Sequence, residues 1–302
     1  MFFAFFAAFT GAVISVMVAV NGELSRASGV YTATLLIYLT GLAATLVFCA
    51  LRRTPLRPVR SLAFYWYCGG FVGLAITLCN NLSYGRISMS AIVALGLLGQ
   101  VVTSLVLDTF GLLGMPKIRF LPGQLGGIAL VLAGIAVMFA GSPVDWFAVA
   151  VAALAGVATV INRTLNAGLS AKTSLWTGTF YNYITGLAGA AAVLALSGEG
   201  LALPHLTAAN GWVLTGGWIG VCVVLLSSWT VVKMPAFAMT LLMFVGQVFA
   251  GVAIDVLATG SFSAAQAAGG AFAAAGLAVN QWVLLRAARG AAKADEAAQS
   301  NG

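Results

Sequence analysis

Two glutamines occupy equivalent places inside long apolar stretches of the chain. Gln100 and Gln247 are 147 residues apart, and each follows a glycine and precedes a valine. An amide side chain can donate and accept hydrogen bonds, and an unpaired polar group is costly in hydrocarbon. Such a group therefore bonds a neighbouring helix or binds a ligand in a cavity. We assign both glutamines to a substrate-binding site and keep interhelical bonding as the alternative.

Two carboxylates show the same spacing. Asp108 and Asp255 are also 147 residues apart, near the ends of apolar stretches. Ionisable groups so close to hydrocarbon are functional candidates, because they can take up protons or line a pathway. The alternatives are that each side chain reaches the membrane interface or pairs with a neighbouring base. We predict a coupling or gating role for the pair.

Three further charged residues join this coupling or gating group. Glu23 lies at the outer end of the first apolar stretch, where it could pair with Arg26 across one helical turn or guard an outer gate. Arg86 and Lys233 stand opposite each other at the same 147-residue spacing. We therefore include Glu23, Arg86 and Lys233 with the two aspartates.

The other substrate-binding candidates are amides and aromatic rings within apolar stretches or at their ends. A ring at such an end can also belong to the interfacial aromatic belt, and an amide can also bond across helices. These candidates are Asn21, Asn80, Asn81, Tyr84, Asn182 and Trp229.

No arrangement typical of an enzyme or a metal centre is visible in the sequence. There is no phosphate-binding loop, no HExxH metal-binding motif and no Ser/His/Asp set. No other typical metal ligand lies next to His205 in the sequence. We expect no catalytic residue, no metal and no cofactor. An intramembrane enzyme stays an alternative, because spatial convergence cannot be read from one dimension. The four cysteines lie in apolar stretches without a CxxC pair, at Cys49, Cys68, Cys79 and Cys222.

The spacing of 147 residues belongs to a larger internal repeat. Pairing residues 65–108 with 212–255 gives 10 identities in 44 positions, without a gap. A fixed offset on this scale indicates two copies of one structural unit. The chain of 302 residues is 61% hydrophobic and only 7% charged, against roughly 25% charged residues in soluble domains. We therefore predict an all-α integral membrane protein with ten transmembrane helices, arranged as two five-helix repeats.

The apolar segments set the predicted boundaries. Residues 1–141 form the first repeat, 142–145 a short linker and 146–285 the second repeat, and the polar residues 286–302 form a disordered cytoplasmic tail. The ten spans are expected at about residues 1–20, 30–51, 63–84, 88–110, 121–141, 145–162, 175–196, 210–231, 235–258 and 264–285, since a span needs roughly 20 residues.

Basic residues indicate the orientation. With the N-terminus in the cytoplasm, 12 of the 14 Lys and Arg residues fall inside, and only Arg26 and Arg86 fall outside. Basic residues accumulate on cytoplasmic loops, so this bias, rather than nucleic-acid binding, explains the net charge of +7. Both termini are then cytoplasmic. Because five spans is an odd number, the second repeat is predicted to be inverted relative to the first, as in secondary transporters.

Several motifs resemble a known family. They are Gly69-Gly70 with Gly73, Gly99-Gln100 with Ser104, Asp108-Thr109-Phe110-Gly111-Leu112, and Gly126-Gly127 with Gly134. This pattern is similar to the YdcZ-like branch of the drug/metabolite transporter superfamily. The resemblance implies a ten-helix carrier of the bacterial inner membrane that exports small solutes. It also implies a central cavity lined largely by the first, third and fourth helices of each half.

These observations together predict a secondary-active exporter of a small metabolite or drug-like solute that works by alternating access. An importer, or a membrane sensor or packing subunit that transports nothing, stays as an alternative. The expected partners are a small-molecule substrate and the lipid bilayer, with protons as the candidate coupling ion and no nucleic acid. The protein is expected to be a monomer or a homodimer.

Overall fold

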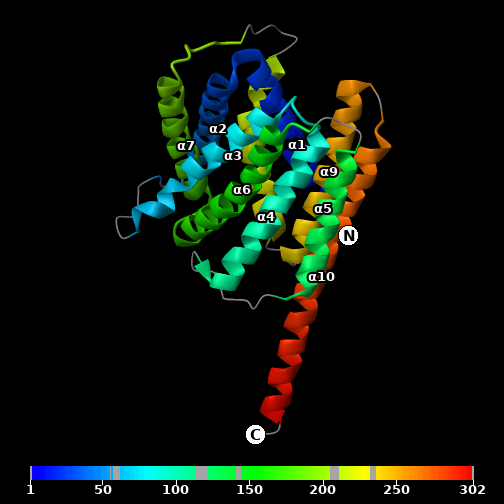
Figure 1. Ribbon diagram of the computed structural model, residues 1–302. Coiled ribbons are helices and arrows are strands. Elements are labelled where there is room, and N and C mark those ends of the chain that lie inside the picture. The colour runs from blue at the N-terminus through cyan, green and yellow to red at the C-terminus, as the bar shows by residue number, and fades with distance from the viewer. Residues whose placement is uncertain are drawn as a thin grey trace.

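The computed structural model describes the backbone of residues 2–54, 56, 62–112, 121–140, 144–204, 211–231, 236–260 and 262–300; the side chains of 2–4, 108, 228–231, 236–241 and 288–300 lie outside this description. The described part is almost entirely helical (Figure 1). Its helices are α1 (Phe2–Ser28), α2 (Val30–Arg52), η1 (Phe64–Cys68), α3 (Gly69–Ser83), α4 (Met89–Phe110), α5 (Gly123–Met138), α6 (Trp146–Lys172), α7 (Leu175–Ser197), η3 (Gly211–Thr215), α8 (Gly216–Val231), α9 (Ala236–Thr259) and α10 (Ala264–Ser300).

Each predicted span corresponds to one of the ten α-helices. Seven of these helices are long and apolar enough, by length and composition, to cross a membrane: α1, α2, α4, α6, α7, α9 and α10. The others, α3, α5 and α8, have 15, 16 and 16 residues, about 23 Å at 1.5 Å per residue, against a hydrocarbon core of ~30 Å. Five-residue 3₁₀ helices, η1 and η3, lead directly into α3 and α8. The prediction of an all-helical membrane protein is confirmed.

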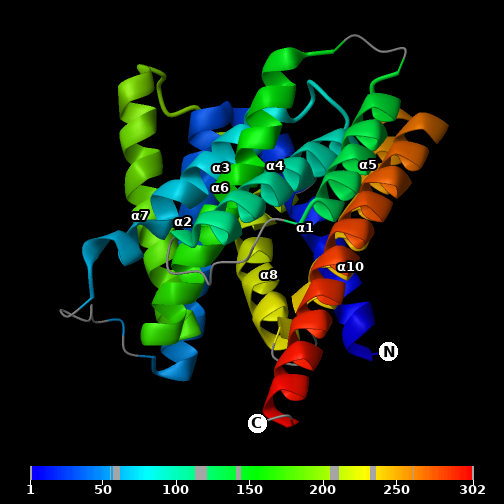
Figure 2. The ribbon, with the colours of Figure 1, turned by 60° about the horizontal axis from the view of Figure 1, so that its bottom comes forward.

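The main contacts between a helix of the first half and a helix of the second half have equivalent contacts in which the two halves are interchanged. Helix α1 packs on α8 and α9, and its counterpart α6 packs on α3 and α4. Helices α2 and α7 pack on each other, as do α5 and α10. Figures 1 and 2 show α5 and α10 side by side on one flank, with α2 and α7 on the other. The 147-residue offset also relates the starts of η1 and η3, and those of α3 and α8.

The contact between α2 and α7 depends on two small residues. The rings of Tyr38 and Tyr183 meet edge-on with centroids 5.9 Å apart. Each ring lies against a glycine of the opposite helix, Tyr183 on Gly41 and Tyr38 on Gly186, and a Cβ atom at either glycine would overlap the ring. Small residues at such crossings let the two backbones approach closely.

Three predicted boundaries are wrong. Helix α1 ends at Ser28 and α6 at Lys172, eight and ten residues beyond the predicted span ends. Both helices continue because a buried face continues, with Leu24 and Leu169 each 1% exposed. The backbone of residues 286–300 continues α10, where the polar composition predicted a disordered tail.

Candidate functional site

Most of the predicted coupling or gating residues that the structure describes meet in one pocket. The pocket lies at the end of the molecule that carries the turn between α3 and α4 and the C-terminal end of α9, which we call the upper end because it is uppermost in Figure 1. Its volume is about 320 Å³. The lining residues with polar or charged side chains are Glu23, Arg26, Tyr84, Arg86, Ser88, Asp255, Thr259 and Gln266.

Asp255 fastens α9 to the first turn of α4. Its carboxylate accepts hydrogen bonds from the backbone N–H groups of Met89 and Ser90 at 2.6 and 2.9 Å, and from the Ser90 hydroxyl at 2.7 Å. The first N–H groups of a helix have no partner within the helix, and the helix dipole favours an anion there. Asp255 is only 7% exposed. Among the described residues its partners are these N–H groups and this hydroxyl, not a base, so the carboxylate caps a helix of the other half.

Tyr84 links the turn before α4 to α1. Its ring lies on Gly22, where a Cβ atom would overlap it, and its hydroxyl donates to Glu23 Oε1 at 3.0 Å. Arg26 Nη1 contacts the same oxygen at 3.2 Å, so the predicted pairing of Glu23 with Arg26 is present. Burial, with the hydrogen bond to Glu23 and its charge, raises the pKa of Tyr84 to about 12. The hydroxyl therefore remains a donor at every physiological pH.

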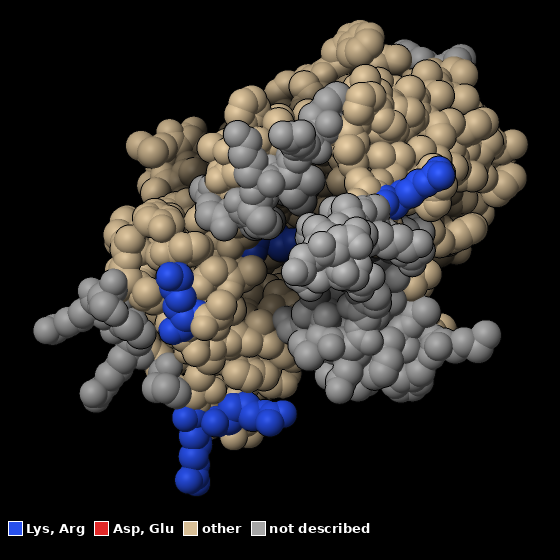
Figure 3. All heavy atoms as spheres, turned by 90° about the horizontal axis from the view of Figure 1, so that it is seen from below, with Lys and Arg blue, Asp and Glu red and all other residues tan. Residues whose placement is uncertain are grey.

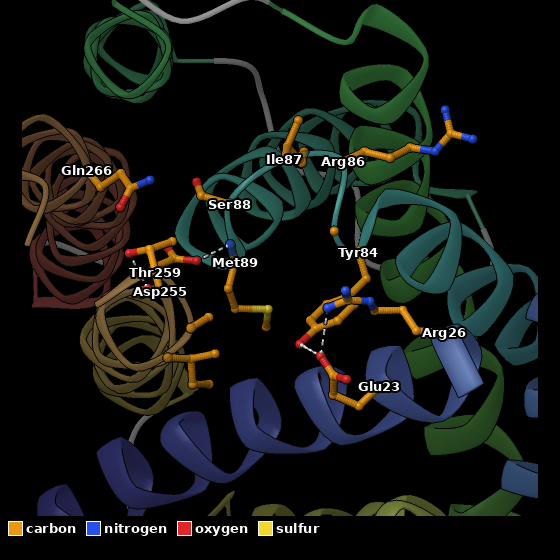
Figure 4. Close-up of a pocket in the computed structure, with 13 residues that line it drawn as sticks. Glu23, Arg26, Tyr84, Arg86, Ile87, Ser88, Met89, Asp255, Thr259 and Gln266 are labelled. Carbon is orange, nitrogen blue, oxygen red and sulfur yellow. Dashed lines mark hydrogen bonds and ion pairs between the residues drawn. The ribbon is translucent and has the colours of Figure 1, made fainter. Parts of the chain in front are cut away.

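Arg86 belongs to a different contact. Its Nη1 lies 3.4 Å from Asp145 Oδ2, and its guanidinium lies 5.1 Å from the centroid of the Phe147 ring. Asp145 also accepts from the N–H of Ala148 and caps α6; this bond, followed by Arg86, lowers the pKa of Asp145. Figure 4 shows the Arg86 side chain pointing away from Asp255. Arg86 therefore holds the turn before α4 against the start of α6.

A hydrophobic core adjoins the pocket. Met89, whose side chain lies between Tyr84 and Asp255 (Figure 4), packs in one buried cluster with Val18 and Phe244. The cluster therefore joins α4 to α1 and α9. We call the three hydrogen bonds of Asp255 together with this cluster the upper closure.

The predicted glutamines lie deeper in the molecule. Gln100 is half-buried in α4, and its Oε1 lies 3.5 Å from Arg163 Nη2 of α6. Gln247 is half-buried in α9, and its backbone carbonyl accepts from the hydroxyl of Ser15 at 2.9 Å. The structure thus brings an arginine to Gln100 that the sequence assigned to a cytoplasmic loop.

Three asparagines form a network that sequence reasoning missed in large part. Asn162 Nδ2 donates to the Gly69 carbonyl at 2.6 Å and to Asn182 Oδ1 at 3.2 Å. Asn166 Nδ2 donates to Asn162 Oδ1 at 2.8 Å and to Asn182 Oδ1 at 3.1 Å. Only Asn182 was a candidate. The spacing of four residues between Asn162 and Asn166, on one helix face, was a usable signal.

The network also corrects the register of the repeat. The Oδ1 atoms of Asn21 and Asn166 are buried without a hydrogen-bond partner, and they point at Gly216 and Gly69, the first residues of α8 and α3. Asn21 is therefore the counterpart of Asn166, at an offset of 145 residues. Asn162, which like Asn21 is followed three residues later by a leucine, lies one helical turn earlier and is not the counterpart.

The other candidates have separate positions. Asn81 is 5% exposed, and its Nδ2 donates to Thr34 Oγ1 of α2 at 3.3 Å, which is an interhelical bond. Asn80, on the same helix, is half-buried. The side chains of Asp108 and Trp229, and the whole of Lys233, lie outside the described residues. Among the residues that the structure describes, no group of His, Cys, Asp and Glu side chains could hold a metal ion.

The lower end, opposite the pocket, has a different surface. Figure 3 looks at this end, where every described charged side chain in view is basic, and some of the basic atoms lie at the bottom of a hollow. Arg163 stands nine residues before the end of α6, about 14 Å along the helix. Its side chain is exposed. The molecule thus has a closed upper end and a hollowed, basic lower end.

Comparison with known proteins gives one family and one fold. The model of the family described as "Putative inner membrane exporter, YdcZ", of the drug/metabolite transporters, matches residues 2–137 and 147–279. A solved structure titled "Crystal structure of protein" is 17% identical, with a TM-score of 0.62 over 94% of this chain and 97% of the other. At this identity the likeness concerns the fold alone. A search of curated proteins gives no match.

Proposed function

The chain belongs to the YdcZ family of inner membrane exporters, and from this premise we propose that it is a secondary-active carrier that moves a small metabolite or drug-like solute out of the cell by alternating access. The proposed halves are residues 1–141 and 146–285, inverted relative to each other. The paired helix contacts, which exchange α1 with α6 and α4 with α9, support this arrangement. In such carriers the solute binds near the midplane between the halves.

One observation carries the proposal: the two ends of the molecule differ. At the upper end, Asp255 of the second half bonds the first turn of α4 in the first half, and Val18 is buried beside it. At the lower end, the position equivalent to Val18 at the 145-residue offset is Arg163, which is exposed. A carrier at rest in one of its two orientations has one closed gate and one open vestibule.

The proposed orientation places the lower end in the cytoplasm. Described basic residues at this end include Arg52 and Arg53 at the end of α2 and Lys172 at the end of α6, as expected for cytoplasmic segments. Both termini would then be cytoplasmic. A solute entering the lower hollow from the cytoplasm and leaving past Asp255 would be exported, and protons are the proposed coupling ion.

Cysteine labelling tests the two orientations without knowledge of the substrate. In a variant without the four native cysteines, Val18→Cys and Ala167→Cys are made separately, Ala167 being exposed one helical turn beyond Arg163. A membrane-impermeant maleimide should label Ala167→Cys only from the cytoplasmic side, and Val18→Cys slowly and only from outside. A sensor or packing subunit with a fixed core would leave Val18→Cys unlabelled from either side. Opposite sidedness would refute the orientation.

Flux measurements separate the remaining alternatives. Metabolites that raise the melting temperature of the purified protein bind its native state and become test substrates. In proteoliposomes a carrier gives saturable, solute-specific flux. Accumulation against the gradient in the inward direction, in cells, would favour an importer.

A further inference from the structure

Resting on the proposed carrier function, we infer that the solute is a small anion and that Arg163, an exposed side chain of α6 beside Gln100, binds its carboxylate or phosphate group. Arg163 is a described basic residue far from any end of its helix, nine residues before Lys172. A charged side chain inside a spanning segment is costly and is retained for a partner or a function. The role of Arg163 therefore depends on which group its guanidinium binds.

The described surroundings of Arg163 contain no acidic side chain bonded to it. Its described contact is with Gln100 Oε1 at 3.5 Å, a neutral acceptor at the outer limit of a hydrogen bond. The neighbouring polar residues on α6 are Thr159, Asn162 and Asn166, which are uncharged and bond within the protein. Among the described residues, the positive charge of the guanidinium is therefore uncompensated, and most of its five donors are available to a ligand.

The repeat indicates that the fold does not need this arginine. At the equivalent position of the first half stands Val18, 8% exposed in the hydrophobic cluster of the upper closure. The same helix crossing is thus built with a valine in one half and an arginine in the other. A requirement of packing would apply to both copies, so the charge in the second copy serves something else.

The chemistry of the site selects the class of ligand. A guanidinium presents planar N–H donors that match the two oxygens of a carboxylate or phosphate. The Gln100 amide beside it can add one donor to the same oxyanion or to a neutral part of the solute. A cationic solute would meet like charge at Arg163, so the site favours anions.

A first test measures the electrostatic charge close to Arg163. In the cysteine-free variant, Ala167→Cys is reacted with an anionic and with a cationic methanethiosulfonate of similar size. The ratio of the anionic to the cationic reaction rate should be about tenfold higher at this cysteine than for a free thiol in solution. The reason is the unpaired positive charge nearby. Arg163→Gln should abolish this preference and Arg163→Lys should retain it. A preference that survives Arg163→Gln, or none in the parent, overturns the inference.

A second test measures binding to the full-length protein in a neutral detergent. Melting temperatures are recorded with benzoate, lactate, inorganic phosphate and glucose 6-phosphate, and with choline and glycerol as cationic and neutral probes. At least one anion should raise the melting temperature of the parent and of Arg52→Gln, the control at an exposed arginine at the end of α2, but not that of Arg163→Gln. Stabilisation by choline or glycerol alone, by no probe, or equally in Arg163→Gln overturns the inference.

Two further experiments test other partners for Arg163, a lipid headgroup and the carboxylate of Asp108. If added phosphatidylglycerol stabilises the protein through Arg163 and no soluble anion does, the arginine binds a lipid headgroup and the inference fails. If Asp108→Asn and Arg163→Gln each lower stability and the double variant adds nothing, the arginine is the partner of Asp108 and the inference fails.

The outcome for transport is separable from the outcome for binding. Anion binding through Arg163 without flux in proteoliposomes refutes the proposed carrier but leaves the anion site in place. Flux of a cation that Arg163→Gln leaves unchanged refutes the anion site but leaves the carrier.

Discussion

Removal of the Asp255 carboxylate should open the upper end of the molecule. Asp255→Ala leaves two backbone N–H groups and the Ser90 hydroxyl without their acceptor. An unsatisfied buried donor costs ~1–3 kcal/mol; water that enters the opened site recovers part of this, so we expect roughly 3 kcal/mol for the three together. A shift of that size changes the equilibrium between two conformations by roughly 150-fold.

The labelling rate of Val18→Cys measures this equilibrium directly. From the outer side, the maleimide should react up to roughly 150-fold faster in the Asp255→Ala background, if opening limits access. Asp255→Asn should have a smaller effect, because its amide oxygen can still accept one of the three hydrogen bonds. Asp108→Ala, at the equivalent position of the other half, serves as the matched control and should not accelerate labelling at Val18.

An unchanged labelling rate would refute the gating role of Asp255. If Asp255→Ala lowers the melting temperature but Val18→Cys reacts as slowly as before, the carboxylate stabilises the fold in both orientations. Its bonds to α4 would then be structural, and the upper closure would have to open elsewhere.

Three other expectations follow from the described contacts. Replacing Gln100 or Gln247 with leucine should weaken solute binding by ~1–3 kcal/mol with little loss of melting temperature; a lower melting temperature at unchanged affinity would assign the glutamines to helix bonding. Because the pKa of Tyr84 is raised to about 12 in the folded state, from ~10 when exposed, its contribution to stability is complete below pH 10 and is lost as pH rises towards 12. Tyr84→Phe should reduce that alkaline fall in a pH titration of the melting temperature, and between pH 6 and 9 it should lower the melting temperature by the same amount at each pH, because the hydrogen bond to Glu23 is lost. Gly186→Leu should destabilise strongly, since the ring of Tyr38 fills its place, whereas the same change at exposed Gly200 should not; equal melting temperatures of the two variants would contradict this.

The sequence predicted the helices well because apolar length decides them. A run of roughly 20 apolar residues has few alternatives to a helix in a bilayer, where every backbone polar group must be satisfied internally. The repeat was equally visible, because its landmarks keep one offset. The ends of α1 and α6 were harder, since Asn21 and Asn162 read as polar termini while the buried face continues through Leu24 and Leu169.

The candidate site was predicted as a set of residues but not as a set of contacts. Asp255 was identified from its cost near hydrocarbon, yet its partner is the backbone at the start of α4, and a backbone partner leaves no mark in side-chain patterns. Arg163 was counted as a loop residue because its helix was ended one position before it. The offset between α1 and α6 is 145 residues rather than the 147 residues of the other landmarks, and the contacts of Asn21 and Asn166 reveal it.

The asparagine network makes the two halves unequal, and inequality has a consequence for a carrier that works by exchanging the conformations of its halves. With identical halves, the inward- and outward-open states would be related by a two-fold rotation about an axis in the membrane plane and equally populated in the absence of gradients. At the 145-residue offset, Asn162 and Asn182 correspond to Met17 and Ile37, which cannot rebuild the same hydrogen bonds. Each such bond contributes ~1 kcal/mol in a membrane, so a few of them set a resting bias of tenfold or more. Without solute, the carrier would then populate mainly one of the two states, and the three asparagine side chains would determine which one.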